Sequence, residues 1–412
     1  MRTILTLSLI ATLCVPAICQ GVDRYVDGTG AGGAYMTITG AMLASAPGDR
    51  ILVLPGTYPA FQFSRGVHVI GLGTDPSQVV VARIAYHVSI PALNYDTLIS
   101  NLTVSSNNPL DVLSIHGNEL APGTLTIDGC VLQNGVYLRG GEQGFYALIN
   151  NTSVTPPTGH GFTGEACYLG GPGNYVEVRN TRIQAWDADQ ALGVPAGVAL
   201  RLAAGTTARV IGGEITGGDG AGSPAPFTSG GDAIVSIIPG TVSLDLTGGV
   251  QVTGGAASGA APGGHGTAIH GSVKIESAFV SGGAGVPAGL THAVAQPSSS
   301  SSVHLVMNPG FQYAQGGVSL SPGQSLSVVL GSGLGLGALG ISLGVELPSG
   351  SNFVTLALSQ MVVIPMSSWS ATIPNVPGLS IPGLMVYIQG VTLDPVSGSV
   401  NISDTAAVRI DF

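Results

Sequence analysis

The feature that most constrains this chain is a short apolar pattern that returns along much of its length. An apolar residue, a short polar or glycine insert and a second apolar residue recur in segments that begin 22 to 36 residues apart. These segments begin at Ile99, Ile127, Ile149, Val178, Val210, Leu246 and Ile275. A second series of short apolar stretches lies between them, beginning at Gly135, Glu165, Gly197, Asp232, Thr267 and Thr291. Strands this short cannot bury their apolar sides alone, so neighbouring turns of the chain must stack.

This pattern predicts an all-β fold, a right-handed parallel β-helix. Its coils would lie ~4.8 Å apart, with Ile, Leu and Val stacked in an inner core. The variable spacing fits such a solenoid because extra residues can be accommodated in loops at the coil corners. The longest insertions are rich in glycine and begin at Gly217, Gly254 and Gly282.

The first coil begins with the sequence GDRILVLPGTY, which ends at Tyr58. Together with the residues before it, from Tyr25 onward, this stretch resembles the start of the pectin-lyase-like β-helix superfamily. The resemblance implies a β-helix over residues 22–312, but little about a reaction, because one fold hosts many functions. An open first coil needs a cover. We expect a capping helix over Thr37–Ala46, with Thr37 as its N-cap.

The C-terminal part, residues 317–412, does not continue the repeat pattern. The stretch IPNVPGLSIPGLMVYIQGVTLDP, which begins at Ile373, resembles a C-terminal β-sandwich module of secreted bacterial proteins. We therefore expect a small β-sandwich domain there, with a seam near residues 297–316.

The N-terminus has the features of a secretory signal peptide over residues 1–19. Arg2 precedes the apolar stretch from Ile4 to Ile18, and a small-x-small site follows. We expect a secreted or cell-surface protein with no further membrane span. Cys130 and Cys167 remain after cleavage, and the sequence leaves open whether they form a disulfide or are two buried thiols.

Charge is scarce in this chain. It has 12 Lys and Arg against 22 Asp and Glu among 412 residues, a formal net charge of −10, and Lys274 is its one lysine. Such a balance excludes a basic surface for nucleic acid and disfavours acidic glycans. We expect a monomer whose partner, if any, is an extracellular polysaccharide or a cell-surface glycan.

Two kinds of β-helix enzyme suggest catalytic residues in this chain, glycosidases and lyases. Gly-His-Gly occurs at residues 159–161 and 264–266, as in polygalacturonase-type glycosidases, but the carboxylate motifs that this reaction needs are missing.

Lyase-type elimination needs a base and a cation that stabilises the developing enolate. The nearest constellation offers Arg179 and Arg182 as bases, and Asp187 and Asp189 as Ca²⁺ ligands. Two aspartates supply too few oxygens for Ca²⁺. We expect no cofactor otherwise.

Strand alternation predicts one outer-face cluster. If Val198 and the other apolar residues of its strand point inward, then Tyr137, Arg139, Glu165 and Arg201 lie on one outer face, where an aromatic ring and charged groups can bind sugar. The same residues would also suit an ordinary solvent face. Because charge is scarce, the sequence favours a non-catalytic structural, adhesive or glycan-binding scaffold, with a polysaccharide lyase or glycoside hydrolase as the alternative.

Overall fold

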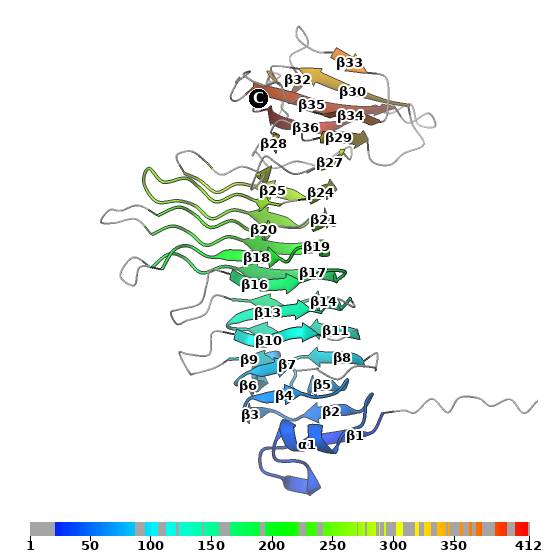
Figure 1. Cartoon of the computed structure of the whole chain (residues 1–412), viewed down its shortest axis with the longest axis vertical. Coiled ribbons are helices and arrows are strands. Elements are labelled where there is room, and N and C mark those ends of the chain that lie inside the picture. The colour runs from blue at the N-terminus through cyan, green and yellow to red at the C-terminus, as the bar shows by residue number, and fades with distance from the viewer. Residues whose placement is uncertain are drawn as a thin grey trace, which may run out of the picture.

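The computed structural model is a right-handed parallel β-helix, which confirms the predicted all-β fold (Figure 1). It describes residues 21–288 apart from 87–94, 106–112, 121–122, 142–143, 156–164, 190–193, 222–227, 237–241, 270, 277 and 286–287. Beyond residue 288 it describes the backbone of strands that lie between His292 and Ile410. The predicted signal peptide, residues 1–19, lies outside the described residues.

Each coil contributes strands to up to three faces of the solenoid. Face 1 stacks, in parallel, β1 (Asp23–Val26), β2 (Arg50–Val53), β5 (His68–Gly71), β8 (Tyr95–Ser100), β11 (Gly123–Asp128), β14 (Tyr146–Asn150), β17 (Tyr175–Gln184), β19 (Thr207–Thr216), β21 (Val242–Thr247), β24 (Gly271–Glu276), β27 (Ser302–Met307) and β29 (Ser325–Leu330). The two long strands β17 and β19 also reach face 2.

Faces 2 and 3 are built from shorter strands. Face 2 contains β3 (Gly56–Tyr58), β6 (Val79–Val81), β9 (Thr103–Val104), β12 (Val131–Leu132), β15 (Ser153–Val154), β22 (Gln251–Thr253) and β25 (Phe279–Ser281). Face 3 contains β4 (Phe61–Phe63), β7 (Ile84–Tyr86), β10 (Leu113–Leu120), β13 (Gly135–Gly140), β16 (Glu165–Gly170), β18 (Val198–Leu202), β20 (Ile234–Ser236), β23 (Thr267–Ala268), β26 (His292–Ala293) and β28 (Val318–Leu320).

The apolar residue that begins each predicted segment points into the solenoid. Strand register stacks these residues in one column on face 1, and each of them is at most 2% exposed. The column consists of Ile99, Ile127, Ile149, Val178, Val210, Leu246 and Ile275. Burial of one such side chain contributes about 1.5–3 kcal/mol, so the repeated pattern supplies the core.

The insert between the two apolar residues is a turn that leads from face 1 to face 2. The second residue of the insert has a left-handed backbone, with φ of +54° at Asn101, +47° at Asn151 and +44° at Asn180. Glycines take the same place in other coils, with φ of +61° at Gly129 and +64° at Gly212. Asparagine and glycine are the residues that adopt this conformation most readily, which explains why these two types recur in the inserts.

A short helix covers the first coil, as predicted. The helix α1 (Ile38–Ala44) begins after Thr37, whose side-chain oxygen accepts a hydrogen bond from the Gly40 amide at 3.0 Å. Its buried residues are Ile38, Ala41 and Met42. Our prediction extended the helix to Ala46, which instead lies outside it and is exposed because the chain turns away after Ser45.

The chain segment before the cap is held by a buried carboxylate. Asp49 accepts hydrogen bonds from the amides of Val22 at 2.8 Å and Ala46 at 2.9 Å, and pairs with Arg24 at 3.0 Å. Burial acts to raise the pKa of Asp49, but these hydrogen bonds and the guanidinium outweigh it and lower the pKa. Asp49 therefore ties β1 and the end of the helix to the first coil.

The glycine-rich insertions form a packed body rather than open loops. We call this body the glycine slab: residues 185–197, 217–231, 254–264 and 282–285, as far as they are described. The chain segments that form the slab, which we call its arms, project to one side of the solenoid (left in Figure 1). One series of hydrogen bonds of 2.8 to 3.0 Å runs through them, with donors before acceptors: Gly197 to Trp186, Gly218 to Gly197, Gly231 to Gly218, Gly255 to Gly231, Gly264 to Gly255, and Gly283 to Gly264.

The slab leaves no room for side chains at its contacts. A Cβ on Gly218 would lie 1.8 Å from the Trp186 carbonyl oxygen, and one on Gly255 would lie 1.9 Å from that of Gly218. Neither glycine has a positive φ. Glycine is therefore needed here for close backbone approach and not for an unusual conformation.

The structure also shows the state of the two cysteines and the orientation of Val198. Cys130 and Cys167 are free and buried, and burial raises the pKa of each thiol to about 12. Val198, expected to point inward, is only partly buried, whereas Ala199 and Leu200 are both fully buried. Alternation breaks at this position because β18 begins where the slab joins face 3.

The parallel pairing continues beyond residue 317. β28 pairs with β26 and β29 with β27, both in parallel. The later strands are β30 (Leu336–Ser342), β31 (Val345–Glu346), β32 (Thr355–Leu356), β33 (Val362–Ile364), β34 (Ser368–Thr372), β35 (Leu384–Leu393) and β36 (Val400–Ile410), which pair antiparallel except where β36 joins β28. Except for β31 and β32, which form a two-stranded sheet of their own, these strands extend the solenoid sheets, and the separate sandwich over residues 317–412 stays a prediction. The short helices η1 (Ala31–Gly33) and η2 (Pro76–Gln78) complete the fold.

Candidate ligand-binding groove

A groove of about 470 Å³ lies on the outer surface of face 1, over four successive coils. It is lined by residues of β17, β19, β21 and β24: Tyr175, Thr207, Ala208, Arg209, Ser243, Leu244, Asp245, Ser272 and Lys274. None of these residues was singled out as a site residue by the sequence analysis.

Four short sequences in register build the groove. They are YVEV from Tyr175, TARV from Thr207, SLDL from Ser243 and SVKI from Ser272, and each stacks on the one before. The second and fourth residues are buried, so the first and third point outward because side chains alternate along a strand. The first residues form one outward column and the third residues form another.

The first column changes abruptly in size. Tyr146 and Tyr175 stack with ring centres 5.4 Å apart and planes 12° apart. The next residues in the column are Thr207, Ser243 and Ser272, which are far smaller. The groove therefore runs along a row of hydroxyl groups and ends at Tyr175.

Glu177 holds the two tyrosines in place. Its side chain is only 6% exposed, and its Oε2 accepts hydrogen bonds from the hydroxyls of Tyr146 at 3.3 Å and Tyr175 at 3.4 Å. Its other oxygen accepts a hydrogen bond from Arg179. Burial, and then the neighbouring carboxylate, raise the pKa of Tyr175, so the phenol stays protonated as a donor.

The second column alternates in sign. Glu177, Arg209, Asp245 and Lys274 follow one another in register, and Arg209 Nε lies 3.4 Å from Asp245 Oδ2. The formal charges of the column cancel. The groove thus offers one aromatic end wall, a row of hydroxyls and a neutral array of charged hydrogen-bonding groups.

The arginines predicted as lyase bases are both paired with glutamates. Arg179 contacts Glu177, and Arg182 Nε lies 3.4 Å from Glu214 Oε2. The hydrogen bond to Glu177 raises the pKa of Arg179, so this guanidinium holds its proton more firmly than usual. A general base has to be able to lose its proton, and this environment opposes that.

The predicted Ca²⁺ ligands lie in the glycine slab. Asp187 Oδ1 accepts a hydrogen bond from the Asp219 amide at 2.8 Å, and Asp219 Oδ1 accepts one from the Ala256 amide at 2.7 Å. Asp189 and Val194 exchange two backbone hydrogen bonds of 2.9 Å. Over the described residues, no three His, Cys, Asp or Glu side chains are grouped closely enough to hold a metal ion. The carboxylate of Asp187 serves to join layers of the slab.

The outer-face cluster predicted from alternation lies on face 3. Tyr137 and Tyr168 stack at 4.5 Å between ring centres, and His116 lies 5.4 Å from Tyr137. Arg201 Nε lies 3.7 Å from Glu165 Oε1.

Of the four predicted residues, the structure pairs Glu165 with Arg201, whereas Tyr168 lies between Tyr137 and Arg201 in register and Arg139 is exposed. Burial raises the pKa of Glu165. Both faces of the Tyr137 ring are covered by other rings, so a sugar can reach only its edge.

The Gly-His-Gly sequence at residues 264–266 has a structural role. The His265 amide donates to Asp232 Oδ1 at 2.6 Å, and Gly264 is part of the slab. The second such sequence, residues 159–161, lies outside the described residues.

Comparisons with known proteins add little about activity. No family model matches the chain. A stretch of 123 residues is 31% identical to the F-box protein SKIP5 of Arabidopsis thaliana and covers 29% of this chain and 43% of that protein. The chain therefore spans less than half of this relative's length. The crystal structure of pectate lyase Pel9A aligns with a TM-score of 0.32 and 15% identity over 76% of this chain and 78% of that chain. In the part of the chain that is described, no helix is long and apolar enough to cross a membrane.

Proposed function

We propose that this chain is a secreted or cell-surface scaffold that binds an uncharged glycan in the face 1 groove without cleaving it. The observation that carries the proposal is the composition of the groove. A tyrosine end wall, a row of hydroxyls and a charge-balanced column suit a ligand that is rich in hydroxyl groups and has apolar ring faces.

The charges favour a neutral ligand over an acidic one. Arg209 is paired with Asp245, and the chain as a whole carries a formal net charge of −10. A polyanion would be repelled over a long range and would have to displace the pairing within the column. Binding should therefore depend only weakly on salt.

The paired arginines support a non-catalytic role. Arg179 and Arg182 each have a glutamate partner, and Asp187 is engaged with the backbone. A polysaccharide lyase or hydrolase would need a free base or a pair of free carboxylates at the groove. The groove residues supply neither arrangement.

The test is a glycan array on the purified chain, followed by calorimetric titration of the best neutral oligosaccharide. Removal of an aromatic stacking surface costs about 1.5 kcal/mol or more, so Tyr175→Ala should weaken binding roughly tenfold or more. The matched control is Tyr168→Ala, which removes the end ring of the stack on face 3 and should change little.

The opposite pattern, weaker binding in Tyr168→Ala alone, would move the site to face 3. Formation of unsaturated uronate products, with or without Ca²⁺, would contradict the non-catalytic proposal. Loss of those products in Arg182→Ala, with the fold intact, would then identify the base.

A further inference from the structure

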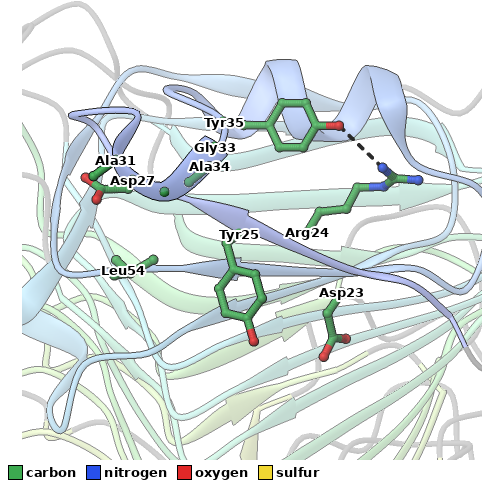
Figure 2. Close-up of a pocket in the computed structure, with 10 residues that line it drawn as sticks. Asp23, Arg24, Tyr25, Asp27, Ala31, Gly33, Ala34, Tyr35 and Leu54 are labelled. Carbon is green, nitrogen blue, oxygen red and sulfur yellow. Dashed lines mark hydrogen bonds between the residues drawn. The ribbon is translucent and has the colours of Figure 1, made fainter.

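A second hollow lies at the N-terminal end of the solenoid, in the cap. It has a volume of about 400 Å³ and lies beside β1 and the turn that follows it (Figure 2). Its lining includes two carboxylates and two phenol rings, from Asp23, Asp27, Tyr25 and Tyr35. It belongs to the first coil, whereas the face 1 groove begins at β17.

Backbone hydrogen bonds hold the hollow in shape. The amide of Tyr35 donates to the carbonyl of Tyr25, and the amide of Asp27 donates to the carbonyl of Tyr35, each at 2.9 Å. The intervening turn includes Gly32 and Gly33, with φ of +65° and +79°. A Cβ on either glycine would meet no atom within 4 Å, so the turn borders open space.

The charges around the hollow leave one carboxylate without a cation. Arg50 binds Asp23 through two hydrogen bonds of 2.6 and 2.8 Å, and Arg24 pairs with Asp49 at 3.0 Å. Asp27 has no arginine partner among the described residues. Its Oδ1 accepts hydrogen bonds of 2.9 Å from the Thr29 amide and hydroxyl, which lower the pKa of Asp27 and keep it ionised at neutral pH.

The aromatic groups complete the arrangement. The Tyr25 residue is 51% exposed, whereas the Tyr35 hydroxyl oxygen accepts a hydrogen bond from Arg24 at 3.4 Å, as Figure 2 shows. A cation is attracted both by the face of a phenol ring and by an unpaired carboxylate. A Ca²⁺ or Mg²⁺ ion needs more oxygen ligands than the single carboxylate of Asp27 supplies.

We propose that the cap hollow binds a small organic ammonium ion, with its positive group between the Tyr25 ring and Asp27. The site is independent of the glycan groove. An organic ammonium suits the hollow better than an inorganic cation because its alkyl groups can contact Leu54 and Ala34 while its charge faces Asp27.

The experiment is a titration of the purified full chain with tetramethylammonium and choline, followed by calorimetry or by NMR of the tyrosine rings. Cation–π contacts at partly exposed sites contribute about 0.5–2 kcal/mol, so Tyr25→Ala should weaken binding roughly twofold to thirtyfold. Tyr25→Phe should bind like the wild type. Asp27→Asn retains an acceptor for Thr29 but removes the charge, and should weaken binding about tenfold.

Two controls make the outcome decisive. The uncharged choline analogue 3,3-dimethylbutanol should bind at least about tenfold more weakly than choline, since it has the same shape without the charge. Tyr168→Ala, on face 3, should leave ammonium binding unchanged. Equal binding of the uncharged analogue, no saturable binding of either ammonium ion, or an unaffected affinity in both Tyr25→Ala and Asp27→Asn would overturn the proposal.

Discussion

The coils and the glycine slab both consist of stacked chain segments, but different interactions hold the segments together. In the coils, columns such as Ile149, Val178 and Val210 fill the interior with branched side chains. In the slab, Gly218, Gly231 and Gly255 are buried with no side chain, and successive arms meet through backbone amides and carbonyls. One region depends on apolar surface, and the other depends on the absence of side chains.

The difference shows that a glycine-rich insertion is not always a flexible linker. The slab gains close packing and one hydrogen bond per contact, in place of the apolar burial that stabilises the coils. Changes in side-chain size should therefore affect the stability of the two regions in opposite ways. Smaller side chains are harmful in the coils, and any added side chain is harmful in the slab.

The largest effect is expected from a charge placed in the coil core. Leu244 is 1% exposed, whereas its neighbour Ser243 points outward. Leu244→Asp should unfold the stack, because an unpaired buried charge costs several kcal/mol. Ser243→Asp should leave the unfolding temperature nearly unchanged. Equal melting curves for the two variants, measured by circular dichroism, would refute the inward assignment.

A side chain added to the slab should have the next largest effect. Gly218→Val places a Cβ within 1.8 Å of the Trp186 carbonyl oxygen, which forces backbone movement and costs about 1–3 kcal/mol or more. Hydrogen exchange should show lost protection over residues 217–221 and 228–231, with the coils retained. Gly28→Ala, where a Cβ meets no atom within 4 Å, is the control. Unchanged protection in Gly218→Val would mean that the slab is not packed as described.

Charge reversal on face 1 should have a smaller effect than either. Arg209→Glu places an acid between Glu177 and Asp245, and exposed pairs of this kind contribute about 0.2–1 kcal/mol. The double variant Arg209→Glu and Asp245→Arg restores an attractive pair and should recover part of the loss. A double-mutant cycle by thermal unfolding measures the coupling, and a zero coupling would show that the column is not a stabilising ladder.

A further prediction concerns pH and the cap. The pKa of Asp49 is lowered in the folded chain, so its contribution is present above its unfolded pKa and is lost as the pH falls through the folded value. Asp49→Asn should destabilise the protein at neutral pH and flatten the acid limb of the stability curve. An acid limb identical to that of the wild type would show that Asp49 does not contribute to it.

The sequence predicted the parts of the fold that lie within one repeat. The column from Ile99 to Ile275 and the Thr37 cap follow from local spacing and side-chain type. The groove was missed because it depends on register between coils, and insertions of variable length hide that register. Aligning YVEV, TARV, SLDL and SVKI would have revealed the alternating signs of Glu177, Arg209, Asp245 and Lys274. The slab was missed because a glycine-rich composition is common to open loops and to packed backbone.

The most direct test of the proposed function is a crystal structure of the chain with the neutral oligosaccharide that binds best. Ligand density should lie on the outer surface of face 1, against the Tyr175 ring and along Thr207, Ser243 and Ser272, with the glycosidic bonds intact. Density on face 3 beside Tyr137 and Tyr168, or a cleaved oligosaccharide in the groove, would contradict it.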